Sequence, residues 1–143
     1  MKKIAIFFII IIAIVSTVAY IYLNQIATNR TLQKENAQFD IKKDQEMIGQ
    51  ELATIMNRVL NTNEKNEIPK NDKGEFIENN ENSIKMDITF TDVDVTYAIE
   101  RIGQAGIASF VQNYRGITFR CSEVQYHKST GRIKYMRFEQ VTE

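Results

Sequence analysis

Cys121 and His127 are the two side chains of this chain that could together support nucleophilic chemistry. They are its only cysteine and its only histidine, and a histidine base can activate a neighbouring thiolate. Cys121 falls in a predicted strand, however, and His127 falls in the turn that follows, with no third group identifiable to orient the imidazole. A core thiol and a solvated turn residue are the simpler interpretation. We therefore expect no catalytic residue, and we expect that the protein is not an enzyme.

Three aspartates, Asp87, Asp92 and Asp94, lie close together around the end of another predicted strand. Carboxylate oxygens are calcium ligands, so this loop could hold one ion. Carboxylates in a connecting loop are more often simply solvated. A single cysteine also excludes a zinc site built on thiolates. We expect no metal and no cofactor.

Residues 71–74, with the sequence Asn-Asp-Lys-Gly, resemble part of a calcium-binding EF-hand loop. With Gly74 at the sixth position of such a loop, Pro69 would occupy the first position and Asn80 the twelfth. Neither residue supplies the carboxylate ligand that these positions require. The sequence predicts an ordinary turn here.

A basic cluster near the C-terminus is the remaining candidate for ligand binding. Basic residues outnumber acidic ones between residues 115 and 137, where Glu123 is the only acid. If alternate residues of the last strand face inward, Arg132 and Lys134 share the outer face, and Arg120 lies beside them on the neighbouring strand. Such a face could bind an anionic envelope polymer, phospholipid headgroups or an acidic partner. A solvated sheet face is the alternative, because charged residues are the usual occupants of exposed faces.

The composition of the whole chain limits the classes of function. Of its 143 residues, 18 are Lys or Arg and 18 are Asp or Glu, so no overall charge attracts nucleic acid. Beyond an apolar N-terminal segment, about 120 residues remain, which suits one small domain and a stalk. The single cysteine also means that no intrachain disulfide can form.

The N-terminal segment predicts a single membrane span. Residues 4–23 contain no charged side chain, and a helix of this length is about 30 Å long, which matches the hydrocarbon core of a bilayer. The lipid bilayer is therefore an expected partner. The span includes Ile4, Phe8, Ile12, Val15 and Leu23.

The flanks of this span predict its orientation. Lys2 and Lys3 precede it, and the first base beyond it is Arg30. By the positive-inside rule, the N-terminus lies in the cytoplasm and the C-terminal part lies outside the cell membrane. A cleavable signal peptide is the alternative, with Thr17 and Ala19 as small residues before a cleavage site. The apolar run exceeds the about 7–15 residues of a cleavable signal, so we expect a retained anchor.

Residues 24–46 contain no Gly or Pro and few apolar side chains, which predicts a solvated helical stalk that continues the span. From residue 48 onward, apolar residues recur at the spacing of one helical face. Gly49 weakens this helix locally and could permit a bend between stalk and domain. We expect the apolar face to pack on a sheet. Its members are Ile48, Leu52, Ile55, Met56, Val59 and Leu60.

Alternation of apolar and polar residues predicts β-strands at residues 84–90, 117–122 and 133–138. The alternation changes parity between Cys121 and Glu123, which predicts a bulge. A short loop with Gly131 near its end separates the last two strands. This loop is typical of a β-hairpin whose turn closes on a left-handed residue.

The remaining segments complete an α+β fold. Residues 61–83 are polar and predict an exposed loop, whereas residues 97–114 have helical spacing that Gly103 and Gly106 divide into two short pieces. The predicted architecture is a transmembrane helix that continues into a long amphipathic helix, packed on a small antiparallel sheet with a C-terminal hairpin. The predicted boundaries are residues 1–23 for the cytoplasmic tip and anchor, 24–46 for the stalk and 47–143 for the extracytoplasmic domain.

This order of elements resembles that of type IV pilins and pseudopilins. It is also similar to small single-span membrane proteins of clostridia, which are low-GC Gram-positive bacteria. Unlike pilins, the chain has no leader ending in Gly and no Glu early in the apolar segment, so processing by a prepilin peptidase is not expected. The resemblance implies a noncatalytic structural or assembly component of the cell envelope that contacts other envelope proteins or itself. The alternative is an extracytoplasmic binding or sensing module for an anionic envelope ligand or partner.

Overall fold

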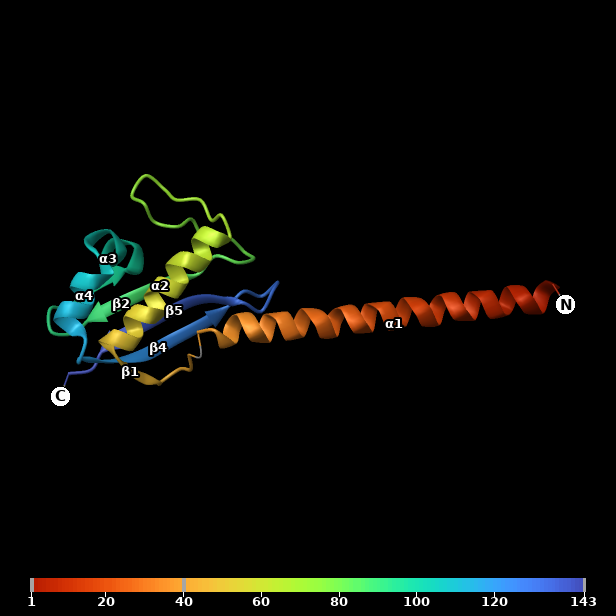
Figure 1. Cartoon of the computed structure of the whole chain (residues 1–143), viewed down its shortest axis with the longest axis horizontal. Coiled ribbons are helices and arrows are strands. Elements are labelled where there is room, and N and C mark those ends of the chain that lie inside the picture. Colours follow the sequence, from red (N-terminus) through yellow and green to blue (C-terminus); the bar gives the residue numbers. More distant parts are fainter. Residues whose placement is uncertain (1, 40, 143) are drawn as a thin grey trace. The chain divides into compact units, whose positions relative to one another are not determined.

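The computed structural model describes residues 2–39 and 41–142, so Met1, Asp40 and Glu143 lie outside it. The chain divides into two compact units, Met1–Glu35 and Asn36–Glu143. Figure 1 shows the order of their elements along the chain. The first unit is a single helix, and the second is the folded domain.

The first unit comprises nearly all of helix α1 (Lys2–Ala37). Its large apolar side chains are exposed on every side, and Ile9 and Leu23 are each 65% exposed. The helix is long and apolar enough to cross a membrane, as predicted, and by length and composition it fits either an anchor or a signal sequence. The side chains of Lys2 and Lys3, on which the predicted orientation depends, lie outside the described part of the chain. The orientation stays a prediction.

Helix α1 does not continue into the amphipathic helix, and this part of the prediction is wrong. It ends at Ala37, strand β1 (Glu46–Ile48) follows, and helix α2 (Gly49–Lys65) begins only after that strand. The reason is that two apolar residues of the predicted stalk belong to the domain core, since Phe39 is 3% and Ile41 is 7% exposed. Their burial contributes about 1.5–3 kcal/mol for each side chain, which outweighs the gain from extending a solvated helix.

The domain contains a five-stranded mixed sheet, and the predicted α+β class is confirmed. Neighbouring strands are antiparallel except β2 and β5, which run parallel. The prediction of a wholly antiparallel sheet is wrong at this one pair. No hairpin joins β2 to β5, because β3, both short helices and β4 lie between them in the chain, and such a long connection permits parallel pairing. In spatial order the strands are β1, β4 (Thr118–Tyr126), β5 (Ile133–Gln140), β2 (Lys85–Phe90) and β3 (Val95–Ala98).

The β4–β5 hairpin has the features predicted for it. The register shifts between Cys121 and Glu123, which makes Ser122 the extra residue of a bulge. Gly131 closes the turn with a φ of 70°, and its amide donates to the carbonyl of His127 at 2.7 Å. Local sequence thus determines this part of the sheet.

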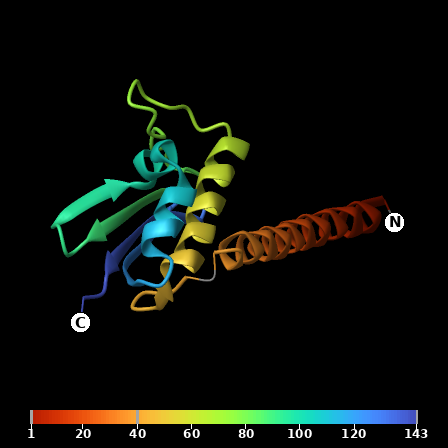
Figure 2. The ribbon, with the colours of Figure 1, turned by 60° about the vertical axis from the view of Figure 1, so that its left-hand side comes forward.

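Helices α2, α3 (Ile99–Ala105) and α4 (Ile107–Tyr114) lie on one face of the sheet (Figure 2). The last two are the predicted short pieces, and they meet at Gly106, whose φ is 101°. Gly49 does not form the predicted bend. A Cβ at this position would lie 2.0 Å from the carbonyl oxygen of Tyr114, so glycine here permits the close approach of α2 to α4.

The core lies between these helices and the inner face of the sheet. The amphipathic face of α2 is buried as predicted, with Leu52, Met56 and Val59 all 0% exposed. Ile48, which was predicted to belong to this face, lies in β1 instead and is 41% exposed. The sheet contributes alternate residues of its three long strands. These inner-face residues are Met86, Ile88, Phe90, Phe119, Cys121, Met136 and Phe138.

Candidate functional site

The structure places Cys121 and His127 in separate settings. The thiol of Cys121 is fully buried, donates to the carbonyl of Glu123 at 3.5 Å, and has its pKa raised by burial to about 11. Such a thiol is protonated at neutral pH and is a poor nucleophile. His127 is 3% exposed, and its Nε2 lies 2.7 Å from the carbonyl oxygen of Ser83. The prediction of a solvated turn residue is wrong for His127, because the loop of residues 79–83 packs against it.

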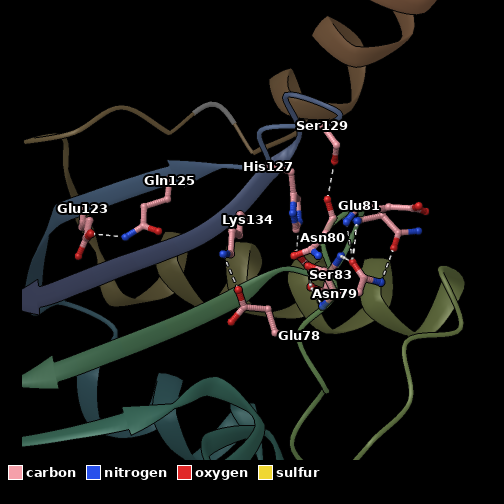
Figure 3. A network of polar contacts seen from close by, with 11 residues as sticks. Glu78, Asn79, Asn80, Glu81, Ser83, Glu123, Gln125, His127, Ser129 and Lys134 are labelled. Carbon is pink, nitrogen blue, oxygen red and sulfur yellow. Dashed lines mark hydrogen bonds and ion pairs between the residues drawn. The ribbon is translucent and has the colours of Figure 1, made fainter.

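Figure 3 shows the polar network around His127. Asn79 folds the loop of residues 79–83, since its Oδ1 accepts three backbone amides at 2.9–3.0 Å. The hairpin turn reaches this loop through Ser129, whose hydroxyl donates to the carbonyl of Asn80. This network joins two turns that are far apart in sequence, and its groups bond one another. Its role is structural.

Asn36 fastens the same hairpin turn from the N-terminal side of the domain. Its Nδ2 donates to the carbonyl of Gly131 at 3.0 Å, and its Oδ1 accepts the amide of Ile133 at 3.1 Å. One side-chain amide thus satisfies a backbone acceptor and a backbone donor, which a carboxylate cannot do. These two hydrogen bonds hold the hairpin turn against the segment that precedes β1.

Asp87, Asp92 and Asp94 do not converge on one point. Asp87 lies in β2, and its Oδ2 accepts the hydroxyl of Tyr135 at 2.8 Å. Asp92 and Asp94 are exposed in the turn between β2 and β3. Within residues 2–39 and 41–142, no three His, Cys, Asp or Glu side chains gather as metal ligands.

Each of the three bases proposed for an anionic-ligand face already interacts with another group of the protein. Arg120 forms an ion pair with Glu46 of β1 (2.6 Å), and Arg132 also has an interaction partner. Lys134 pairs with Glu78, and this bond lowers the pKa of that carboxyl. Arg120 and Lys134 lie toward opposite ends of the β4–β5 ladder. Binding of an anionic ligand stays a prediction, and such a ligand would have to displace carboxylates that are already in place.

A second bulge explains why these bases are not aligned as expected. The register shifts between Gln125 and Tyr126, which makes Lys134 an extra residue in β5. Tyr135 therefore turns to the outer face, where its hydroxyl accepts from Nε of Arg137 at 3.0 Å. Burial raises the pKa of Tyr135 to about 12.

Two hollows in the domain surface lie on either side of helix α3. Residues three and four apart share one side of a helix, so α3 contributes a different set to each. We call the first hollow the aromatic groove and the second the Glu100 pocket. The α3 residues are Arg101, Ile102 and Ala105 in the groove, and Glu100, Gly103 and Gln104 in the pocket.

The aromatic groove has a volume of about 460 Å³. The ring of Phe90 forms part of its wall, with centroids 6.0 Å from Tyr97 and 4.8 Å from Tyr114. Val93 is 62% exposed, and the guanidinium of Arg101 lies 5.7 Å from the centroid of Tyr97. The groove thus offers apolar and aromatic surface with one base beside it.

The Glu100 pocket has a volume of about 380 Å³. Glu100 is 6% exposed, and its Oε1 accepts the amide of Phe76 at 3.3 Å. Burial raises the pKa of Glu100, while the backbone N–H groups of Glu100 and Phe76 act in the opposite direction. Lys70 also lines the pocket, with Nζ 4.6 Å from the ring centroid of Phe76 and 3.4 Å from Oε1 of Glu64.

Sequence reasoning missed both hollows. The groove depends on strand β3, which is too short for its alternation to be visible. The pocket depends on Phe76, which packs against α3 from the polar loop. The one local signal was Phe76 itself, a large aromatic residue in a segment otherwise poor in apolar side chains.

No known protein family, no curated protein and no solved structure matches this chain.

Proposed function

We propose that this protein is a noncatalytic, membrane-anchored component of the cell envelope that acts through protein contacts. Helix α1 carries the proposal, because its side chains are exposed on every side between Ile4 and Leu23 and such a helix requires apolar surroundings. Lys2 and Lys3 favour a cytoplasmic N-terminus, which would put the domain outside the cell membrane. The resemblance to type IV pilins supports an assembly component only in that an apolar N-terminal helix precedes an α+β domain, because α1 does not continue into α2.

The contact surface that we propose is the aromatic groove together with the free edge of β3. This strand pairs only with β2 in the described sheet, so its other edge offers backbone donors and acceptors to an extended segment. Val93 and Tyr97 expose apolar surface beside that edge, and exposed apolar surface of this kind is typical of protein contacts. The occupant that we expect is an extended segment of another envelope protein.

Site-specific photo-crosslinking in intact membranes tests this surface. A photoreactive phenylalanine analogue replaces Val93 in the full chain, and the matched control carries it at Ile77, which is 47% exposed and lines neither hollow. We expect a discrete adduct from position 93 that Tyr97→Ala weakens, and none from position 77. An adduct of twice the chain mass would identify a second copy as the partner. Absence of an adduct at position 93, or equal adducts at both positions, would contradict the proposed surface.

Cysteine labelling tests the orientation separately. Val93→Cys introduces an exposed thiol, whereas the native Cys121 is fully buried and should remain silent. A membrane-impermeant maleimide should label the variant in intact cells and leave the wild type unlabelled. Labelling that requires lysis of the cells would place the domain in the cytoplasm and overturn the proposed localisation.

A further inference from the structure

The Glu100 pocket combines apolar walls with two carboxylates. It lies between α2, the loop that follows α2, and α3. Leu60, Phe76 and Ile107 supply the apolar surface, and Glu100 and Glu64 supply the acids. Its volume of about 380 Å³ falls within the range of small-molecule sites.

Glu100 forms none of the described ion pairs, and the positive charge of Lys85 lowers the pKa of its carboxyl group less than burial raises it. The bond from the Phe76 amide compensates for burial only in part, and burial remains the main influence on the carboxyl group. A buried carboxylate becomes much less costly when a cation lies against it. The electrostatics of the pocket therefore favour a positively charged occupant.

Lys70 shows which kind of cation the pocket surface accommodates. Its ammonium group lies over the ring of Phe76 and beside Glu64, at 4.6 Å from the ring centroid and 3.4 Å from the carboxylate. An aromatic face and a carboxylate around one nitrogen are the usual environment of an ammonium ion. Lys70 is itself exposed, and its nitrogen forms no described bond with Glu100.

We propose that the Glu100 pocket binds a small aliphatic ammonium ion. The charged nitrogen lies against the Glu100 carboxylate, and the methylene groups lie along Leu60, Phe76 and Ile107. A hydrated metal ion would leave these apolar walls unused, and a neutral alcohol would leave the carboxylate without compensation.

Thermal unfolding of the full-length protein in detergent tests the proposal with n-butylammonium chloride as the probe. At constant ionic strength and pH 7, n-butylammonium should raise Tm in a saturable manner, because a ligand that binds only the folded state stabilises it. 1-Butanol and CaCl2 at matched concentrations should leave Tm unchanged. An equal shift with CaCl2 would show a general response to cations and would overturn the proposal.

Three variants locate the effect. Glu100→Gln keeps the shape and the acceptor for the Phe76 amide, and it should weaken binding roughly tenfold or more. Lys70→Ala removes the competing ammonium group and should tighten binding roughly two- to fivefold. Glu67→Gln, an exposed carboxylate on the adjacent loop that does not line the pocket, is the matched control and should change nothing.

A direct measurement keeps the proposal falsifiable if Glu100→Gln fails to fold. In the wild-type protein, NMR should show nuclear Overhauser effects between the butyl methylene protons and an aromatic ring of the domain, which Lys70→Ala should strengthen. A Tm shift retained in Glu100→Gln, or no contact between the butyl chain and a ring, would overturn the assignment.

Discussion

The aromatic groove and the Glu100 pocket share helix α3 but differ in what their walls contribute to the fold. Each has one cation over an aromatic ring, Arg101 over Tyr97 in the groove and Lys70 over Phe76 in the pocket. The groove wall consists of packed aromatic rings that belong to the core. The pocket wall contains the buried carboxylate of Glu100, which adds no apolar packing to the core. The groove side of α3 therefore stabilises the domain, whereas on the pocket side the burial of Glu100 carries a cost that is only partly compensated.

The largest effect is expected from Phe90→Ala on the groove side. Phe90 is 4% exposed and contacts four other aromatic rings. Its truncation should lower the free energy of unfolding by about 3–5 kcal/mol, measured by urea denaturation. Val93→Ala, at the exposed rim of the same groove, should stay within about 0.5 kcal/mol of the wild type. Similar losses in both variants would mean that the ring cluster is not part of the core.

The next effect is a gain in stability from Glu100→Gln on the pocket side. Because burial raises the pKa of Glu100 in the folded state, the folded state holds this proton more tightly than the unfolded state does. Stability from this group is fully present below the ordinary glutamate pKa of about 4.3, and it is lost as the pH rises through the raised value.

Urea denaturation at two pH values measures this difference. Near pH 7, Glu100→Gln should be more stable than the wild type by about 1–2 kcal/mol, and near pH 4 the two should converge. Glu67→Gln should show no such pH-dependent gain. A loss of stability in Glu100→Gln at pH 7 would mean that the carboxylate is compensated by its surroundings, and the contrast between the two hollows would disappear.

A smaller gain is expected from Gly103→Ala, which also faces the pocket. Alanine in a helix interior is more stable than glycine by about 0.5–1 kcal/mol, and the new methyl group would meet only Cδ1 of Leu60 at 3.1 Å. Leu60 is half-buried, so its side chain has room to shift away from the new methyl group. Gly106→Ala is the contrasting control and should destabilise the domain, because its φ of 101° suits glycine. Destabilisation by Gly103→Ala, seen in the same denaturation assay, would show that Leu60 cannot move.

The smallest effects should come from the two cations. Lys70→Ala and Arg101→Ala should each lower the free energy of unfolding by about 0.5 kcal/mol, as for an exposed cation over a ring. Only the Lys70 effect should shrink at high salt, because Lys70 also pairs with the exposed Glu64. Thermal unfolding at low and high NaCl distinguishes the two. Equal salt dependence would show that the Lys70–Glu64 pair contributes nothing.

The elements that the sequence predicted correctly are those with a local cause. The apolar stripe of α2, the parity change at Cys121 and the left-handed turn at Gly131 each leave a pattern within a few residues. The same holds for the division of α3 from α4 at Gly106.

The incorrect or missing predictions depend on contacts between distant segments. Burial of Phe39 and Ile41 ends α1, and neither residue differs locally from a stalk residue. The last two residues of β3, Tyr97 and Ala98, fall within the predicted helical segment because Tyr97 also fits helical spacing, but their pairing with β2 places them in a strand. His127 and Glu100 are buried by the loop of residues 61–83, whose polar composition indicates only exposure. The candidate hollows could not be predicted for the same reason.

The position of β5 has a consequence for how the domain folds. The last strand of the chain, Ile133–Gln140, is also the middle strand of the sheet. The β1–β4 pair and the β2–β3 pair are joined only through β5, so the sheet is completed by pairing between segments that are far apart in sequence. Each residue removed from β5 shortens the central strand by about 3.3 Å, so a shortened β5 would weaken the pairing with both of its neighbours.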